Sequence, residues 1–255
     1  MKQTKLKETI SFILGILLLG LLIQVAGYLR GDRLVFPGVP EIIRAFFLLL
    51  GKASTYKLIW TSMLHLIQAV ALSSLLGVII GLIEGVSDFA GTFLKPLMIL
   101  LRSIPMIVMV VIIMVLTKYD RVPLIASTLF LLPLISEAVC EGYRNIDSNL
   151  IDVYRLNGPL SFYVLSHVHL PLMAGYLKQA FVSAVGMGLK LVVSTEYLVQ
   201  TKNSLGKAVH SSGYFNEYQD IYAYALIMIF LVLLVSAVPT AIAKISRLFI
   251  KPNKK

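Results

Sequence analysis

Long apolar stretches constrain this chain more than any other feature of its sequence. Four of them are plain on inspection: Ile10–Leu29, Leu58–Ile83, Leu94–Leu116 and Ile221–Ala243. Each is close to the roughly 20 residues that a helix needs to cross about 30 Å of hydrocarbon. With 58% apolar residues, 14% charged residues and a mean hydropathy of +0.85, the composition excludes an ordinary soluble globular protein. The sequence therefore predicts an integral membrane protein.

Two less regular apolar stretches raise the predicted number of spans to six. Pro123–Ala138 is short and contains Pro133, and Leu172–Val199 is long and contains Lys190 and Glu196. Backbone amides in lipid must be hydrogen-bonded within their own segment, and the alternating segments typical of an outer-membrane barrel do not occur. We therefore predict an all-α, polytopic membrane protein with six transmembrane helices.

The whole chain, residues 1–255, is expected to form a single membrane domain, because no region is suited to a separate nucleotide-binding domain. Basic residues gather near both ends, and the positive-inside rule then places both termini in the cytoplasm. A net charge of +10 is explained by these anchors, so nucleic acid is not expected as a partner. The first apolar stretch is longer than a usual signal-peptide core and is expected to be retained.

Two local patterns refine the expected bundle. Gly77, Gly81 and Gly85 recur at four-residue intervals in the second span, which favours close approach of two membrane helices. The amphipathic segment Pro40–Leu50 predicts a short interfacial helix after the first span.

A polar interruption separates the fourth and fifth predicted spans and lies in the cytoplasm by this topology. Asp147 or Ser148 is suited to cap a helix that begins near Asn149, and Gly158, followed by proline, should end it. A second short helix over residues 160–168 then precedes Pro171, which is expected to open the fifth span. Residues of about 145–171 are thus predicted to form a helical hairpin.

The spacing within this hairpin resembles the loop that identifies permease subunits of bacterial ABC importers. That loop reads Glu-Ala-Ala, three residues, Gly, nine residues, Ile, one residue, Leu-Pro. In this chain the corresponding positions are Asp152, Val153, Tyr154, Gly158, Val168, Leu170 and Pro171. Asp152 keeps the charge of Glu on a shorter side chain, whereas Val153 and Tyr154 are bulkier than the two alanines. A partner with an enlarged groove is therefore expected.

Four further landmarks are similar to importer permeases of the nitrate, sulfonate and taurine type. They occur in the family's order, at Phe36–Pro40, Leu101–Pro105, Lys190–Leu198 and Leu205–Gly206. The resemblance therefore covers residues from about 36 to 206.

The resemblance implies a non-catalytic transport subunit in the cell membrane of a bacterium. Two permease subunits, expected to be a homodimer, would form the pathway, and a solute-binding protein would deliver a nitrate-, sulfonate- or taurine-like anion or a small heterocyclic nutrient. Two cytoplasmic ATPases would use ATP and Mg²⁺, since this chain has no phosphate-binding Gly-x-x-x-x-Gly-Lys-Ser/Thr sequence. Asp152 and Arg155 would pair with the ATPase, and Gly158 would supply the turn.

Four residues are candidates for the translocation pathway: Arg102, Pro105, Lys190 and Glu196. Ionisable groups within membrane segments usually face a cavity or a partner, although each of these could instead be structural. Lys190 and Glu196 lie six residues apart, about 240° around a helix, and are not expected to pair directly. Arg102 and Lys190 would suit an anion.

Two other classes of function compete with the importer. A proton-coupled secondary transporter would use Lys190 and Glu196 as its relay, and a membrane-embedded enzyme would use Glu137 and Glu141. No metal site is predicted, because the four histidines are not clustered, and the single Cys140 excludes an internal disulfide.

Overall fold

The computed structural model describes residues 35–147, 149–150 and 161–249, together with scattered positions between 11 and 29. Side chains are described as far as residue 237, apart from that of Phe162. The elements are α2 (Val39–Leu50), α3 (Ala53–Val86), α4 (Asp88–Ser103), α5 (Met106–Leu116), η1 (Tyr119–Arg121), α6 (Val122–Arg144), α8 (Phe162–Val164), η2 (Leu165–His169), α9 (Leu170–Leu172), α10 (Ala174–Val199), α11 (Leu205–Tyr214) and α12 (Tyr218–Phe249). The described part of the chain is helical and contains no strand, as predicted.

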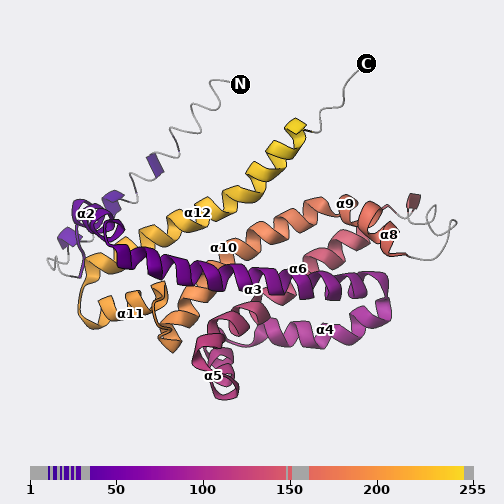
Figure 1. Ribbon diagram of the computed structural model, residues 1–255, viewed down its shortest axis with the longest axis horizontal. Helices are drawn as coiled ribbons and strands as arrows, with labels where there is room; N and C mark the ends of the chain where they lie inside the picture. The colour runs from indigo at the N-terminus through magenta and orange to yellow at the C-terminus, as the bar shows by residue number, and fades with distance from the viewer. Residues whose placement is uncertain are drawn as a thin grey trace.

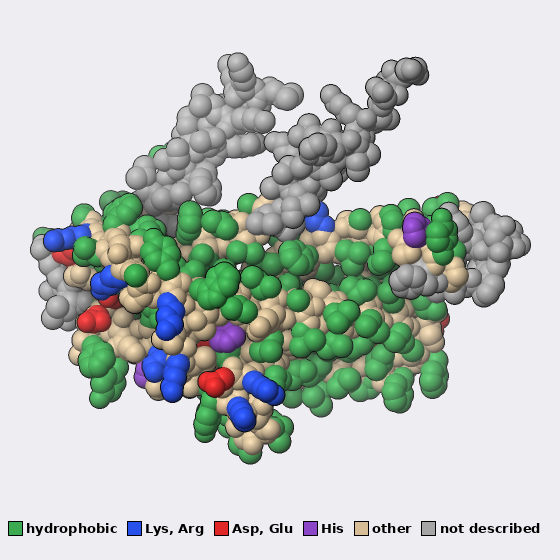
Figure 2. Space-filling model, in the orientation of Figure 1, with side chains coloured by type: hydrophobic (Ala, Val, Ile, Leu, Met, Phe, Trp, Pro, Cys, Tyr) green, Lys and Arg blue, Asp and Glu red, His purple; other side chains and the backbone are tan. Residues whose placement is uncertain are grey.

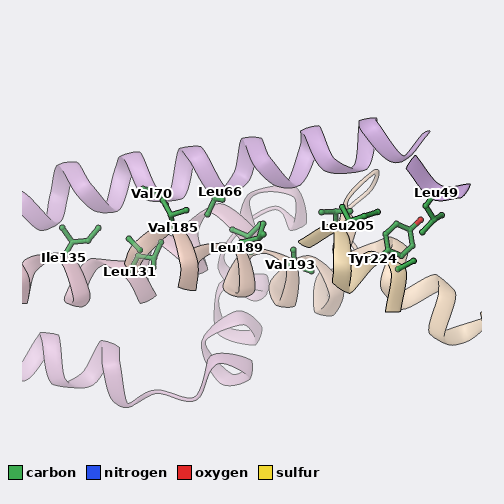
Figure 3. Close-up of a cluster of buried hydrophobic side chains, with 14 of the residues drawn as sticks. Leu49, Leu66, Val70, Leu131, Ile135, Val185, Leu189, Val193, Leu205 and Tyr224 are labelled. Atoms are coloured by element: carbon green, nitrogen blue, oxygen red, sulfur yellow. The ribbon is translucent and has the colours of Figure 1, made fainter. Parts of the chain in front are cut away.

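Three long helices, α3, α6 and α10, form the centre of the bundle and contact one another along their lengths (Figure 1). Their facing sides supply the main hydrophobic core. Figure 3 shows Leu66 and Val70 of α3 opposite Leu131 of α6 and Leu189 of α10. Helices α2 and α12 pack against each other, whereas α4 and α5 lie on another side of α6 (Figure 1).

The predicted close approach at the three glycines of α3 is confirmed. A Cβ atom built on Gly77 would lie 2.9 Å from the Ile135 Cβ, and one on Gly85 would lie 2.9 Å from the Tyr143 Cβ. At Gly81 the obstacle is the backbone carbonyl of Ser136, which cannot rotate away. The pattern therefore marks the contact between α3 and α6.

Four helices are long and apolar enough to cross a membrane: Ala53–Val86, Tyr119–Arg144, Ala174–Val199 and Tyr218–Ala237. They contain most of the predicted second, fourth, fifth and sixth spans. Hydrophobic side chains cover much of the outer surface, as Figure 2 shows over α3 and α4. Such exposure fits a lipid-facing exterior.

The predicted span Leu94–Leu116 is not one continuous helix. Helices α4 and α5 meet there at 101°, so the pair is a broken span or a re-entrant segment. The break falls at Ile104, whose extended backbone (φ −66°, ψ 125°) directly precedes Pro105. A residue before proline is crowded out of the α region by the proline ring, which explains the position of the break.

The expected total of six spans is not established in the described part of the chain. Four helices qualify, or five if α4 and α5 count as one span. In the first predicted span, Gly20–Leu29 is a shorter apolar helix. The predicted helix after that span is present as α2, with Pro40 in its first turn and Glu41 accepting a hydrogen bond from the Gly38 N–H at 2.9 Å.

Candidate functional site

The centre of the predicted hairpin lies outside the described residues. This applies to Asp152, Val153, Tyr154, Arg155 and Gly158. On the preceding side, the Asp147 Oδ1 accepts a hydrogen bond of 2.9 Å from the Asn149 N–H, which is one of the two caps that the sequence predicts.

On the other side, helical turns continue through Pro171 instead of starting at it. Elements α8, η2 and α9 follow one another, and the long span α10 begins only at Ala174. Element η2 is a π-helical turn, in which the Leu170 N–H bonds to the Leu165 carbonyl five residues back. Because proline lacks an N–H and its ring crowds the carbonyl four residues earlier, this wider turn accommodates Pro171.

A buried histidine anchors this segment to the end of α6. His169 is 1% exposed, and its ring centroid lies 5.2 Å from that of Tyr143. Met173 is fully buried nearby, and its side chain approaches Gly142. Burial lowers the pKa of His169, because the charged ring would lose its hydration. The flanks of the hairpin are therefore held together at the end of the bundle away from α2 and α11 (Figure 1).

A cavity of about 510 Å³ lies between α4 and α6, with Glu84 of α3 contributing to its wall. Arg102 crosses from α4 to Glu137 of α6, with two N–O distances of 2.5 and 3.3 Å. Both side chains are about half exposed. In this bidentate geometry two guanidinium nitrogens each bond a different carboxylate oxygen, and the pair links the two helices beside the cavity.

The remaining wall also carries paired polar groups. The Ser136 hydroxyl donates to the Glu84 carboxylate at 2.7 Å, within the close contact between α3 and α6. Arg144 donates to the Glu84 backbone carbonyl at 3.3 Å and to Asp88 at 3.4 Å. Ser103 is the last residue of α4 and also lines this cavity, so the helix break lies at the cavity edge.

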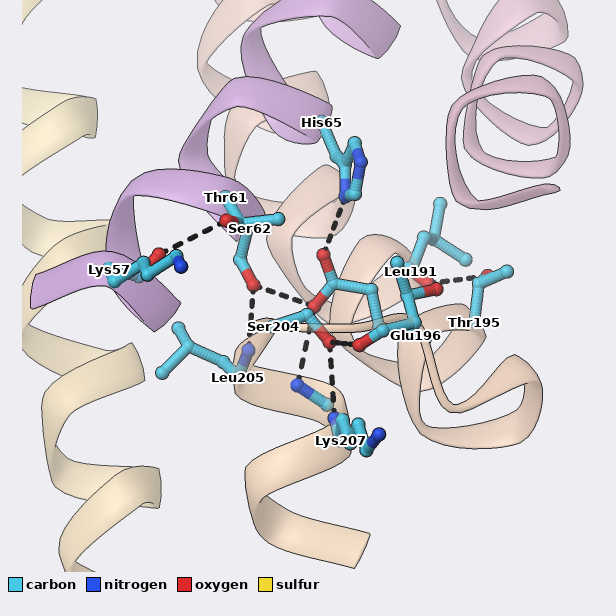
Figure 4. A network of polar contacts seen from close by, with 12 residues as sticks. Lys57, Thr61, Ser62, His65, Leu191, Thr195, Glu196, Ser204, Leu205 and Lys207 are labelled. Atoms are coloured by element: carbon cyan, nitrogen blue, oxygen red, sulfur yellow. Dashed lines mark hydrogen bonds and ion pairs between the residues drawn. The ribbon is translucent and has the colours of Figure 1, made fainter. Parts of the chain in front are cut away.

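A second polar cluster surrounds Glu196, which is fully buried in α10 (Figure 4). The Ser62 hydroxyl donates to its carboxylate at 2.6 Å, and the Gly206 N–H donates at 3.3 Å. The His65 Nδ1 lies 2.8 Å from the other carboxylate oxygen. Glu196 thus joins α3, α10 and the start of α11.

Helix α11 is seated closely on this cluster. Ser204 caps it by accepting a hydrogen bond from the Lys207 N–H at 3.2 Å, and the Leu205 N–H donates to Ser62 at 2.9 Å. A Cβ atom on Gly206 would collide with the backbone of α10 at Val193 and Tyr197. Only glycine allows this approach, which gives the Leu205–Gly206 landmark a structural reason.

Comparison with known proteins identifies the family. The model described as "Binding-protein-dependent transport system inner membrane component" matches residues 73–248, more than half of the chain. The chain belongs to this family. The matched range includes all the residues that line the α4–α6 cavity and the whole predicted hairpin, and from the second cluster it includes Glu196 and Gly206.

A solved structure supports the permease fold. This structure shows the MetNI methionine ABC transporter in inward-facing conformations, in the CY5 native crystal form. One of its chains superposes on this protein with a TM-score of 0.58. The two sequences are 20% identical, and the match covers 73% of this chain and 96% of that chain. The comparison with curated proteins gives no match. The chain is therefore a multi-pass, inner-membrane permease component of an ABC importer.

The four predicted pathway residues of this permease do not form one site. Arg102 lines the cavity, and Pro105 lies at the helix break beside it. Glu196 is buried in a separate cluster, and Lys190 is exposed on α10. The expectation that Lys190 and Glu196 do not pair directly is confirmed, because the partner of Glu196 is His65.

The sequence reasoning missed several partners in the permease. Ser62 and His65 had no assigned role, although a histidine within an apolar span is a signal for an intramembrane partner. Glu137 was considered beside Glu141 without the arginine that contacts it, Arg102, which lies 35 residues away in the chain. Among the described residues, no group of three His, Cys, Asp or Glu side chains could hold a metal ion.

Proposed function

We propose that this permease subunit forms the translocation pathway of an ATP-driven importer that receives a small solute from an extracytoplasmic binding protein. The family match across residues 73–248 carries this proposal. The cavity between α4 and α6 supports it, because charged side chains on membrane helices are tolerated where they face water or a partner.

Coupling to ATP hydrolysis is assigned to the predicted hairpin. Asp152 and Arg155 would contact the ATPase, Val153 and Tyr154 would fill its groove, and Gly158 would turn the chain. Leu170 and Pro171 continue this segment into α10. Because His169 is packed on the end of α6, a force on the hairpin would reach two central helices together.

The proposed complex contains a second copy of this subunit, two ATPases that use ATP and Mg²⁺, and a solute-binding protein. Both termini would lie in the cytoplasm, on the same side as the hairpin. Residues 36–206 resemble permeases of the nitrate, sulfonate and taurine type. This resemblance supports a nitrate-, sulfonate- or taurine-like anion, or a small heterocyclic nutrient, as the solute.

The coupling assignment is tested by Gly158→Asp. We expect this variant to insert into the membrane but to lose co-purification with the ATPase in mild detergent, because aspartate would strain the proposed turn and would add a charge at the proposed contact. Gly51→Asp is the matched control, since Gly51 is exposed at the end of α2 with an ordinary αR backbone. Normal ATPase recovery and uptake with Gly158→Asp would refute the assignment.

A further inference from the structure

The charges around the α4–α6 cavity are balanced. Its wall contains three basic residues, Lys95, Arg102 and Arg144, and three acidic residues, Glu84, Glu137 and Glu141. Four of these six already have partners in the protein: Arg102 with Glu137, Arg144 with Asp88, and Glu84 with Ser136. The cavity therefore does not present the net positive wall that would favour a simple anion.

Lys95 and Glu141 are the two charges that remain. Both side chains are exposed, and neither has a hydrogen bond or ion pair within the part of the chain that the structure describes. They come from opposite walls, Lys95 from α4 and Glu141 from α6. With respect to the described residues, the cavity thus offers one cation and one anion without a partner.

The wall also offers uncharged hydrogen-bonding groups. Thr92 and Ser103, which carry hydroxyl groups, are among its lining residues. Within α4, Pro96 has no N–H to give to the Thr92 carbonyl, which leaves that carbonyl available as an acceptor. At about 510 Å³ the cavity is within the range of roughly 300–1,000 Å³ typical of small-molecule sites.

We propose that this cavity binds a small zwitterion that carries one ammonium group and one carboxylate or sulfonate group, with Lys95 contacting the anionic group and Glu141 the ammonium group. The inference rests on the proposed importer function, and of the solutes proposed there it keeps the taurine-like aminosulfonates and excludes simple anions such as nitrate. A simple anion at Lys95 would leave the Glu141 carboxylate unpaired and repelling it, whereas a zwitterion compensates both charges.

The reactivity of the single cysteine of the chain can be used to measure whether this cavity is occupied. Cys140 is half-buried and lines the wall between Glu137 and Glu141. The experiment measures the rate at which N-ethylmaleimide alkylates Cys140 in the purified importer complex, by mass spectrometry of this subunit. The added solutes are a mixture of uncharged-side-chain amino acids and aminoalkanesulfonates, a matched mixture of carboxylates and sulfonates, and a matched mixture of amines.

We expect the zwitterion mixture to slow alkylation by about tenfold when the component that binds is present at roughly ten times its dissociation constant. The other two mixtures should have little effect. Lys95→Gln and Glu141→Gln should each abolish this protection, whereas Lys95→Arg should retain it. Lys118→Gln, an exposed lysine outside the cavity, is the control.

Equal protection by the anion mixture, or no protection by the zwitterions, would overturn the proposal. If the ATPase still co-purifies in that case, only the assignment of the solute fails and the importer function stands. Failure of the ATPase to co-purify with the unmodified chain would overturn the proposed function and this inference with it.

Discussion

Glu196 shows how one buried charge determines local structure. Its carboxylate accepts hydrogen bonds from Ser62 of α3 and Gly206 of α11, and it lies within hydrogen-bond distance of His65, also in α3. A fully buried carboxylate is tolerated only where such donors replace water. This environment assigns Glu196 a positioning role, in which it holds the start of α11 against the bundle.

Removing this carboxylate should destabilise the protein. Glu196→Ala would leave Ser62, His65 and the Gly206 N–H without their acceptor, at a cost of about 3 kcal/mol. Thermal unfolding in detergent measures the effect. Lys190→Ala, on an exposed position of the same helix, should leave the unfolding temperature nearly unchanged. Equal unfolding temperatures for both variants would contradict the role of Glu196.

His169 should make stability depend on pH. Its pKa is lowered by burial from the ordinary value of 6.5, so the unfolded chain binds a proton at a higher pH than the folded protein does. The contribution of His169 to stability therefore falls as the pH drops below 6.5, and it levels off below the folded-state pKa.

The variant His169→Phe tests this, because it keeps a ring against Tyr143 and removes the titration. Between about pH 7.5 and pH 5.5, its unfolding temperature should decrease less than that of the unmodified protein. The same decrease in both proteins would exclude His169 as the source.

At the scale of elements, the contact between α3 and α6 depends on small residues. A methyl group on Gly81 would meet the backbone carbonyl of Ser136, so the helices would have to separate. We expect Gly81→Ala to lower the free energy of unfolding by about 2 kcal/mol. The matched substitution Gly186→Ala, where nothing lies within 4 Å of the new atom, should have no such effect. Unfolding curves in detergent compare the two variants. An unchanged free energy of unfolding for Gly81→Ala would show that the two helices can separate here at little cost.

The broken helix pair α4–α5 has a different consequence. A turn of 101° interrupts the helical hydrogen-bond ladder, and backbone groups at such a break must find protein or water as partners. Ser103 places one side of the break at the cavity edge. The break thus helps to explain why a polar cavity lies beside an otherwise apolar helix pair.

At the scale of the whole molecule, the two polar clusters lie at different positions along the bundle. In Figure 1, α11 lies toward the end of the bundle near α2, whereas α4 lies toward the opposite end. The flanks of the predicted hairpin continue into α6 and α10. A displacement of the hairpin would therefore act on the core that forms one wall of the cavity.

Much of this architecture was predictable from the sequence, because membrane insertion depends on local composition. About 20 consecutive apolar residues require a helix wherever they occur, and small residues at four-residue intervals require a close neighbour. The family resemblance likewise rested on the order and spacing of residues along the chain. These properties explain why the helical class, most spans and the permease family were predicted correctly.

Which charges meet was decided only by the tertiary structure. Arg102 and Glu137 are 35 residues apart, and Ser62 and Glu196 are 134 apart, so no local pattern connects them. The bend within the predicted span Leu94–Leu116 was not predicted for a similar reason, since hydropathy measures composition and not helix direction. Apolar content alone determines that a segment enters the membrane, but packing between distant helices determines where it bends and which polar groups it buries.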